Sequence, residues 1–365
     1  MTSPSSTSFP VAQLPPGPLD IVGDIHGELD ALNKLLERMG YVDGEHPEGR
    51  RLVFVGDLVD RGHDSIGVLE RVMPWVDSGI ASCILGNHEL NLLLGERKAG
   101  NGWWFGEEER WKSHGRSGSY GSTLATEALR QRALAFFGRL PLVLEREDIR
   151  IVHAAWDSAA VEALSGLDSA ADLKAFNDAR KAELRAETTN DEFYQRERMT
   201  FPSLLTTVIA AQPPRLPRHG YWTQTKQERL AHKLLTSGSE RALSEDEEPF
   251  EAGGKWRMAA RHRWWDSYDE VKPIVVGHYW RTWDHHNPPA GRQHRADFGG
   301  RDHRTQWMGK RKNVYCVDFS AGIRFEARSG FGTIDQSRLV ALRWDEAQPR
   351  LMTDMDRDAE YIETI

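Results

Sequence analysis

Short apolar runs, polar turns and amphipathic segments follow one another in a regular order along the first quarter of the chain. Buried strands are predicted at residues 19–22, 52–55 and 84–85, and a segment with helical spacing follows each of them. Because strand and helix alternate three times, we predict a parallel sheet with the intervening polar residues gathered at the carboxyl ends of its strands. The predicted fold class is therefore α/β.

The later part of the chain keeps this order less strictly. Core strands are predicted at residues 149–152, 271–276, 313–317 and 339–344. Residues 19–365 are interpreted as one domain, in which a charged, partly helical stretch at about 154–270 forms an inserted cap beside the site. A stretch rich in histidine and arginine, at about 283–312, is predicted to be a mobile loop. Residues 1–18 are rich in Ser, Thr and Pro, which predicts a disordered tail.

Polar residues that can bind metal ions follow the predicted strands. The first three strands lead into Gly-Asp-Ile-His-Gly at 23–27, Gly-Asp-Leu-Val-Asp-Arg-Gly at 56–62 and Gly-Asn-His-Glu at 86–89, and two later strands lead to His153 and His278. Two neighbouring divalent ions can hold a phosphoryl group and activate a water molecule together. Asp57 follows the middle strand of the three, so it is the natural bridge between two ions. Several imidazoles favour Mn, Fe, Zn or Co over Mg or Ca.

The composition restricts the class of protein. The 365 residues carry a net charge of −8, so a broad basic surface is not indicated and no stable nucleic-acid partner is expected. No apolar run reaches the roughly 18 residues that a membrane span requires, so no membrane partner is expected. Cys83 and Cys316 lie in apolar runs and are predicted to be core residues. Together these features predict a cytoplasmic protein.

The three strings and the two later histidines closely resemble the motifs of the calcineurin-like metallophosphoesterase superfamily. They are most similar to the branch that holds phosphoprotein phosphatases and bacterial diadenosine tetraphosphate hydrolases. The spacing also agrees, with 33 residues from Asp24 to Asp57 and 30 from Asp57 to Asn87. The resemblance implies a four-layer α/β/β/α sandwich, here with an inserted cap. It also implies two divalent metal ions as cofactors, with Mn favoured and Fe, Zn or Co as alternatives.

The resemblance further implies a role for each motif residue. His88 would be the general acid for the leaving oxygen, oriented by Asp60, and Arg61 would hold the phosphate. A second phosphate-binding arginine is expected from this branch. Arg281 is the first candidate because it follows a ligand histidine closely, although a surface arginine is an equal alternative. The implied metal ligands, of which Asn87 would also contact substrate, are Asp24, His26, Asp57, Asn87, His153 and His278.

The chain departs from the family pattern in two places. Ala154, Ala155 and Trp156 follow His153 where a small Gly-Gly or Ala-Gly pair is usual. Trp280 stands where the nuclease and phosphodiesterase branches carry a second histidine, which favours the phosphatase-like branch. Trp280, Trp103 and Trp104 are candidates for contact with substrate, with packing as the alternative.

We therefore predict a metal-dependent phosphoric ester hydrolase in which an activated water attacks phosphorus directly. Its predicted type is a serine/threonine protein phosphatase, with a phosphoprotein as the substrate partner. The alternative within enzymes is hydrolysis of a nucleotide polyphosphate such as diadenosine tetraphosphate. The alternative outside enzymes is a catalytically silent binding module on the same fold.

Overall fold

Two stacked sheets form the centre of the chain in its computed structural model, which describes residues 9–113, 115–201, 212–252, 255–283, 304–344, 348–356 and 360–362. A six-stranded sheet has the order β17-β16-β15-β2-β3-β4, and a five-stranded sheet has the order β1-β7-β8-β13-β14. The strands of the first are β2 (Leu19–Val22), β3 (Arg51–Phe54), β4 (Ala81–Cys83), β15 (Val340–Trp344), β16 (Arg350–Thr353) and β17 (Glu360–Tyr361). The strands of the second are β1 (Val11–Gln13), β7 (Val143–Glu145), β8 (Arg150–Val152), β13 (Ile274–Val276) and β14 (Val314–Cys316).

The strands are apolar on both faces, which is why they appear in the sequence as continuous hydrophobic runs. Ile21 and Val53 belong to a core cluster shared with Val275 of the second sheet, so they fill the space between the sheets. Their neighbours Val22 and Phe54 belong instead to a larger cluster with the covering helices. Successive side chains of a strand thus point alternately to the other sheet and to the helices, which gives the predicted four-layer α/β/β/α sandwich. The predicted parallel pairing of β2, β3 and β4 is also confirmed.

Three helices begin close to the motif strings: α1 (Leu29–Met39), α2 (Ser65–Asp77) and α3 (Asn87–Leu93). Of these, α1 and α2 pack on strands of the six-stranded sheet, and α4 (Glu127–Phe137) packs against α2 and α3. Helix α1 buries Leu32, Leu35 and Leu36 on one face and ends at Gly40, whose φ of 88° suits glycine. The carboxylate of Asp64 caps α2 by accepting the amide of Gly67 at 2.8 Å. These helix starts fix the ends of the motif loops.

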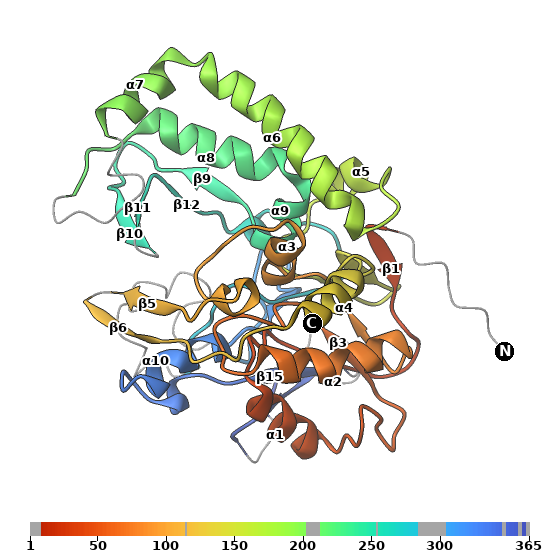
Figure 1. Cartoon of the computed structure of the whole chain (residues 1–365). Helices are drawn as coiled ribbons and strands as arrows, with labels where there is room; N and C mark the ends of the chain where they lie inside the picture. Colours follow the sequence, from red (N-terminus) through yellow and green to blue (C-terminus); the bar gives the residue numbers. More distant parts are fainter. Residues whose placement is uncertain are drawn as a thin grey trace.

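The segment between β8 and β13 forms a separate helical layer, and we call residues 154–270 the cap. Figure 1 shows α6, α7 and α8 as the outermost layer above the core. The ends of the cap meet, because β8 and β13 are parallel neighbours and the Gly277 amide donates to the carbonyl of His153 at 2.9 Å. Its elements are α5 (Ser158–Leu164), α6 (Leu173–Thr189), α7 (Glu192–Thr200), α8 (Pro217–Arg229), α9 (Ala231–Ser237), β9 (Glu240–Ala242), β10 (Phe250–Ala252), β11 (Lys255–Arg257) and β12 (Ala259–Arg261).

The predicted disordered tail over residues 1–18 is wrong from residue 9 onward. Strand β1 pairs in parallel with β7, and Ala12 and Leu14 are buried between the sheets. A strand of three residues is too short to show a period in the sequence, which explains the error. Both cysteines are buried and unpaired, as predicted.

The structure describes only part of the predicted mobile loop at 283–312. Residues 284–303, which hold its histidines at 285, 286 and 294 and the one at 303, lie outside the described residues. Within 304–312, Trp307 is buried against Tyr315 and Trp344 and belongs to the core.

Among the described helices, none combines the length and the apolar character that a bilayer span demands.

Candidate active site

The motif residues meet at the carboxyl ends of β2, β3, β8 and β13, as the strand order predicts. Five of them have left-handed backbone although none is glycine. Such a conformation costs roughly 1–3 kcal/mol for each residue and is typical of functional sites. The surrounding hydrogen bonds therefore impose a geometry that the free chain would avoid. The five residues and their φ angles are His26 (50°), Asp57 (50°), Asp60 (76°), Arg61 (67°) and His278 (68°).

Glu89 holds the loop that carries Asp57. Its fully buried carboxylate accepts the backbone amides of Asp57 and Leu58, each at 2.8 Å, and that of Gly86 at 3.1 Å. One side chain thus ties the loops after β3 and β4 together. Glu89 therefore braces the two loops that carry Asp57 and Asn87.

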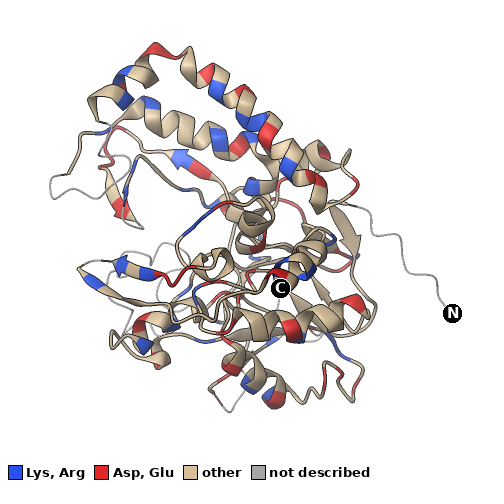
Figure 2. Cartoon of the chain, in the orientation of Figure 1, with Lys and Arg blue, Asp and Glu red and all other residues tan. Residues whose placement is uncertain are grey.

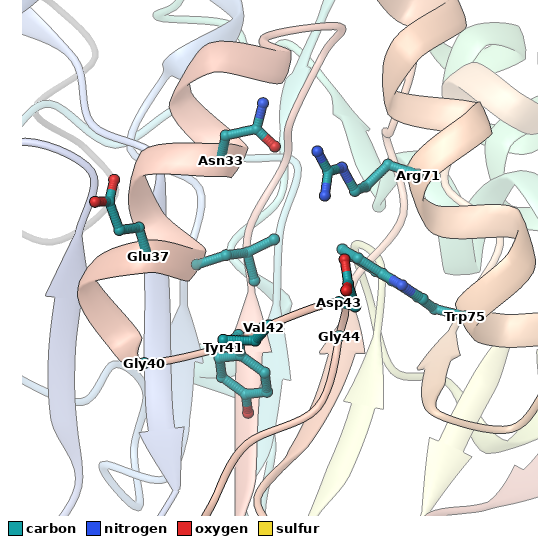
Figure 3. Close-up of a pocket in the computed structure, with 10 residues that line it drawn as sticks. Asn33, Glu37, Gly40, Tyr41, Val42, Asp43, Gly44, Arg71 and Trp75 are labelled. Carbon is teal, nitrogen blue, oxygen red and sulfur yellow. The ribbon is translucent and has the colours of Figure 1, made fainter.

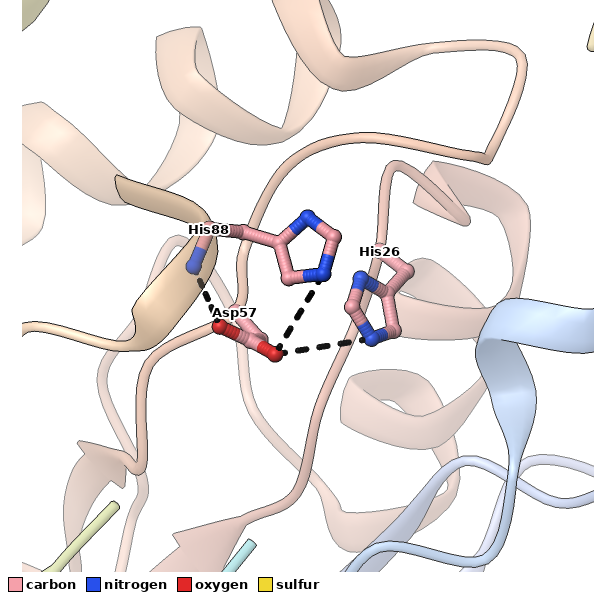
Figure 4. A group of neighbouring side chains, drawn as sticks. All are labelled: His26, Asp57 and His88. Atoms are coloured by element: carbon pink, nitrogen blue, oxygen red, sulfur yellow. Dashed lines mark hydrogen bonds and ion pairs between the residues drawn. The ribbon is translucent and has the colours of Figure 1, made fainter. Parts of the chain in front are cut away.

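A first group of donor atoms comes from His26, Asp57 and His88, all within 4.8 Å of one another (Figure 4). Nε2 of His26 lies 3.6 Å from Oδ2 of Asp57 and 4.0 Å from Oδ2 of Asp24. Nδ1 of His26 lies 3.1 Å from the carbonyl of Val59, which can only accept a proton. The lone pair of Nε2 therefore points into the site, as a metal ligand requires.

A second group comes from Asp57, His153 and His278. Nε2 of His153 lies 3.3 Å from Oδ2 of Asp57, and its Nδ1 lies 2.6 Å from the carbonyl of Val55. Oδ1 of Asn87 lies 2.8 Å from Nδ1 of His278 and 3.2 Å from Nε2 of His153. Asp57 belongs to both groups, which is the position predicted for a bridging ligand.

The electrostatics of the two groups suit a cation. Burial, and then the nearby Asp318 and Asp57, raise the pKa of Asp24 well above its usual value. Its Oδ1 is buried without a partner among the described residues. Burial opposes the ionisation of Asp57, but His153 and other imidazoles hold the pKa of Asp57 well below its usual value. Burial also opposes the protonation of His153, but Asp57 raises the pKa of His153 to about 10. Divalent ions would relieve the repulsion between the carboxylates, and the nitrogen and oxygen donors fit transition metals.

His88 and Asp60 lie side by side, which is the arrangement that the predicted acid role requires. Nδ1 of His88 lies 2.6 Å from Oδ2 of Asp60, and both side chains are buried. The indole N–H of Trp103 donates to Oδ1 of Asp60 at 2.7 Å, so both carboxylate oxygens are occupied. This contact was missed in the sequence, where Trp103 was a candidate for substrate contact. Trp103 is 2% exposed and acts as a brace for Asp60.

Arg61 reaches the site and Arg281 does not. Nη1 of Arg61 lies 2.8 Å from Nε2 of His26, and its guanidinium lies 4.2 Å from the ring centroid of Trp280. The prediction for Arg281 is wrong, because its buried guanidinium donates to the carbonyl of Cys316 at 2.9 Å. Asp318 accepts the amide of Trp280 at 2.6 Å and holds a left-handed turn there, which directs the next side chain into the core.

Arg261, a cap residue that no sequence pattern indicated, lies near the group of Asp57, His153 and His278. The guanidinium of Arg261, on β12, is 5.4 Å from the ring centroid of Tyr279. Burial lowers the pKa of His278, and the charge of Arg261 is the next largest cause. Among the described residues no carboxylate lies within 4.0 Å of Arg261. No local pattern distinguishes Arg261 from Arg257 or Arg263, so the sequence held no signal for it.

A pocket of about 320 Å³ between α1 and α2 lies apart from these groups. Figure 3 shows Asn33 and Glu37 on one wall and Arg71 and Trp75 on the other. None of its lining residues belongs to the motif strings, so it is not the active site.

Comparison with known proteins places the motif strings in a family context. The family model of calcineurin-like phosphoesterases matches residues 17–227, which is more than half of the chain. Over 74 residues the chain is 45% identical to an asymmetrical bis(5'-nucleosyl)-tetraphosphatase, PrpE, of Geobacillus thermodenitrificans. Over 93 residues it is 41% identical to a symmetrical bis(5'-nucleosyl)-tetraphosphatase of Ralstonia nicotianae.

These matches cover limited parts of each protein. The first spans 19% of this chain and 30% of the Geobacillus protein, and the second spans 25% of this chain and 29% of the Ralstonia protein. Among solved structures, a cold-active protein-tyrosine phosphatase of a psychrophilic Shewanella species aligns with a TM-score of 0.47 and 15% identity. That alignment covers 99% of this chain and 85% of the Shewanella chain.

Proposed function

Because this chain belongs to the calcineurin-like phosphoesterase family, and is thus a metal-dependent phosphoester hydrolase, we propose that its substrates are nucleotide polyphosphates of the diadenosine tetraphosphate type. The observation that supports this class is the identity of 41–45% with segments of two bis(5'-nucleosyl)-tetraphosphatases. The site adds an aromatic surface, since the partly exposed ring of Trp280 lies beside Arg61. A nucleobase can stack on such a ring while the phosphates face the arginine.

The residues at the site divide the work of hydrolysis. In this proposal Asp24, His26 and Asp57 hold one ion, and Asp57, Asn87, His153 and His278 hold the other. When bound, two such ions supply Lewis-acid stabilisation of phosphoryl charge and a nucleophilic water at neutral pH. Mn is the proposed metal, with Fe, Zn or Co as alternatives that have the same ligand preferences.

The proton for the leaving group comes from His88 in this proposal. Asp60 accepts from Nδ1 of His88, so Nε2 faces Asp57 and the site, at 3.9 Å from Oδ2. The carboxylate fixes the tautomer and stabilises the imidazolium that donates the proton. Trp103 positions this pair through the indole N–H that it donates to Asp60.

A phosphoserine or phosphothreonine protein phosphatase is the second candidate. The Asp60, Arg61 and His88 set resembles that of the branch that holds phosphoprotein phosphatases as well as diadenosine tetraphosphate hydrolases, so it supports this candidate and the first one equally. Both candidates need the same metals and the same acid, so only the leaving group and its binding surface distinguish them.

A substrate panel tests the proposal. The full chain with Mn should hydrolyse diadenosine tetraphosphate with a kcat/KM at least about tenfold above that for a phosphothreonine peptide, a gap of about 1.4 kcal/mol in transition-state binding. Nucleotide products are separated by chromatography and phosphate release is measured for the peptides. A clear preference for the peptides would replace the proposal by the second candidate. Turnover of p-nitrophenyl phosphate alone would reject both.

Arg261 is proposed to contact the phosphates from the cap side. Charge-assisted hydrogen bonds contribute about 1.5–3 kcal/mol, so Arg261→Ala should lower kcat/KM for the polyphosphate about 10- to 150-fold, mainly through KM. Arg257→Ala, on neighbouring β11, is the matched control and should stay within about twofold of wild type. An unchanged KM in Arg261→Ala would remove Arg261 from the site.

A further inference from the structure

The cap contains a second pocket, separate from the metal-binding groups. Its volume is about 470 Å³, which lies in the range of sites for small ligands. It is formed by α6, α7, α8 and α9 with β9, and none of its lining residues belongs to a motif string. The polar side chains of interest in its wall are Lys181, Arg185, Tyr194, His219, Lys226 and Lys233.

The wall of this pocket is strongly basic although the chain as a whole carries a net charge of −8. Glu240 is the acidic residue of the lining, and burial raises its pKa. Outside the lining, Glu96 pairs with Lys181, Lys233 and Lys98, so one carboxylate serves three ammonium groups. Figure 2 shows basic residues interspersed with acidic ones along α6 and α8.

Two further cations in the wall lack an acidic partner. Over the ranges that the structure describes, no carboxylate lies within 4.0 Å of Arg185 or Lys226. Nζ of Lys226 instead donates to the hydroxyl of Tyr194 at 3.2 Å. Positive charge therefore exceeds negative charge around the pocket, and an anion would be attracted into it.

Two histidines in and beside the pocket have lowered pKa values, for which burial is the largest cause and nearby cations come next. Burial lowers the pKa of His219 to about 4, and the charges of Lys226 and Arg198 add to this shift. Burial likewise lowers the pKa of His232 to about 3, with Lys233 and Lys181 as the next causes. Nδ1 of His219 is buried and has no hydrogen-bond partner among the described residues.

One side of the pocket carries aromatic and apolar side chains in direct contact with these cations, since Lys226 donates to the hydroxyl of Tyr194. The rings of Tyr194 and His219 stack with 5.7 Å between centroids and 16° between planes. Leu184 and Leu230 complete this side, and both are buried in the small core of the cap. Cations that lie beside aromatic and apolar side chains suit a ligand with a charged chain and a flat ring system.

We propose that the cap pocket binds a small anion with more than one phosphate group, at a site distinct from the metal centre. Lysine ammonium groups act as point charges for phosphate, and Arg185 offers planar donors at the rim. The shared chemistry is a polyphosphate chain, supplied either by a free inorganic polyphosphate or by a nucleotide.

Calorimetric titration of the full chain with tripolyphosphate and with ATP, in chelator and without divalent metal, tests this proposal. Both probes lack metal partners under these conditions, so the result is independent of the proposed hydrolysis. The double variant Arg185→Gln/Lys226→Gln should weaken binding by at least about tenfold, the equivalent of one lost charge-assisted bond. Raising the salt concentration should weaken wild-type binding as well.

Matched variants separate the cap pocket from other cationic sites. Lys174 lies on α6, as Arg185 does, and pairs with Asp178. Lys174→Gln should therefore leave the affinity within about twofold of wild type. Arg61→Ala should also leave the affinity of the cap pocket unchanged. Lys226→Arg, which keeps the charge, should bind the probes as well. Tighter binding of ATP than of tripolyphosphate identifies a nucleotide as the ligand, and equal binding identifies the phosphate chain alone. Absence of saturable binding, or equal affinity in the folded double variant, would overturn the proposal.

Discussion

Replacing Asp57 by asparagine should remove both metal ions from the site and lower kcat by about 10³-fold or more. Oδ2 of Asp57 lies within 4 Å of Nε2 of His26 on one side and Nε2 of His153 on the other. A neutral amide cannot bridge two cations, and the ions supply several kcal/mol of transition-state stabilisation. Oδ1 accepts the amide of His88 at 2.9 Å, and an asparagine oxygen can keep this bond.

Single-site variants give the comparison for this result. His26→Ala and His278→Ala should each lose about one metal ion per chain by elemental analysis, because each residue belongs to one group. Asp77→Asn changes a half-exposed carboxylate paired with Arg139 and should keep the full metal content. If Asp57→Asn lost only one ion, the bridging role would belong to another residue.

His88→Asn should keep the metal ions and lose about 10²–10⁴-fold in rate on substrates with poor leaving groups. The loss should shrink for p-nitrophenyl phosphate, because p-nitrophenolate departs with little need of a proton. Steady-state rates on the two substrate types, with the metal content measured in parallel, check this prediction. Equal losses on both types would assign His88 to metal binding, where its place in the first donor group puts it within reach.

Trp103 and Trp104 provide a matched test of how the acid is positioned. Trp103→Phe removes the N–H that donates to Asp60 at 2.7 Å, and should produce a smaller loss with the same dependence on leaving group. Trp104 is also buried, but among the described residues its indole N–H donates no hydrogen bond to Asp60. Trp104→Phe should therefore show the same dependence on leaving group as the wild type. A purely structural role for Trp103 would lower all rates by one common factor.

The central site could be predicted because its residues sit in short strings directly after buried strands. Asp24, Asp57 and Asn87 follow strands whose apolar runs are plain in the sequence, and parallel pairing then brings them together. His153 and His278 follow strands that are likewise neighbours. The structure brings these residues together, while their individual catalytic and metal-binding roles stay predictions.

Other parts of the site depend on contacts that no local pattern carries. Trp103 and Asp60 are 43 residues apart, and their bond depends on how a loop returns over the sheet. Arg281 points into the core because Asp318 fixes a left-handed turn at Trp280. Arg261 lies near the second group only through the docking of the cap. Each outcome is decided by tertiary packing, which hydrophobic periodicity does not describe.

Metal content measured together with activity tests the central claim most directly. The purified full chain is stripped with chelator, verified metal-free by elemental analysis, and titrated with Mn while hydrolysis of p-nitrophenyl phosphate is followed. If Asp57 bridges two ions, the metal-free chain should have no activity. The rate should then rise to its maximum at about two Mn per chain. Full activity in the verified metal-free chain would contradict the account.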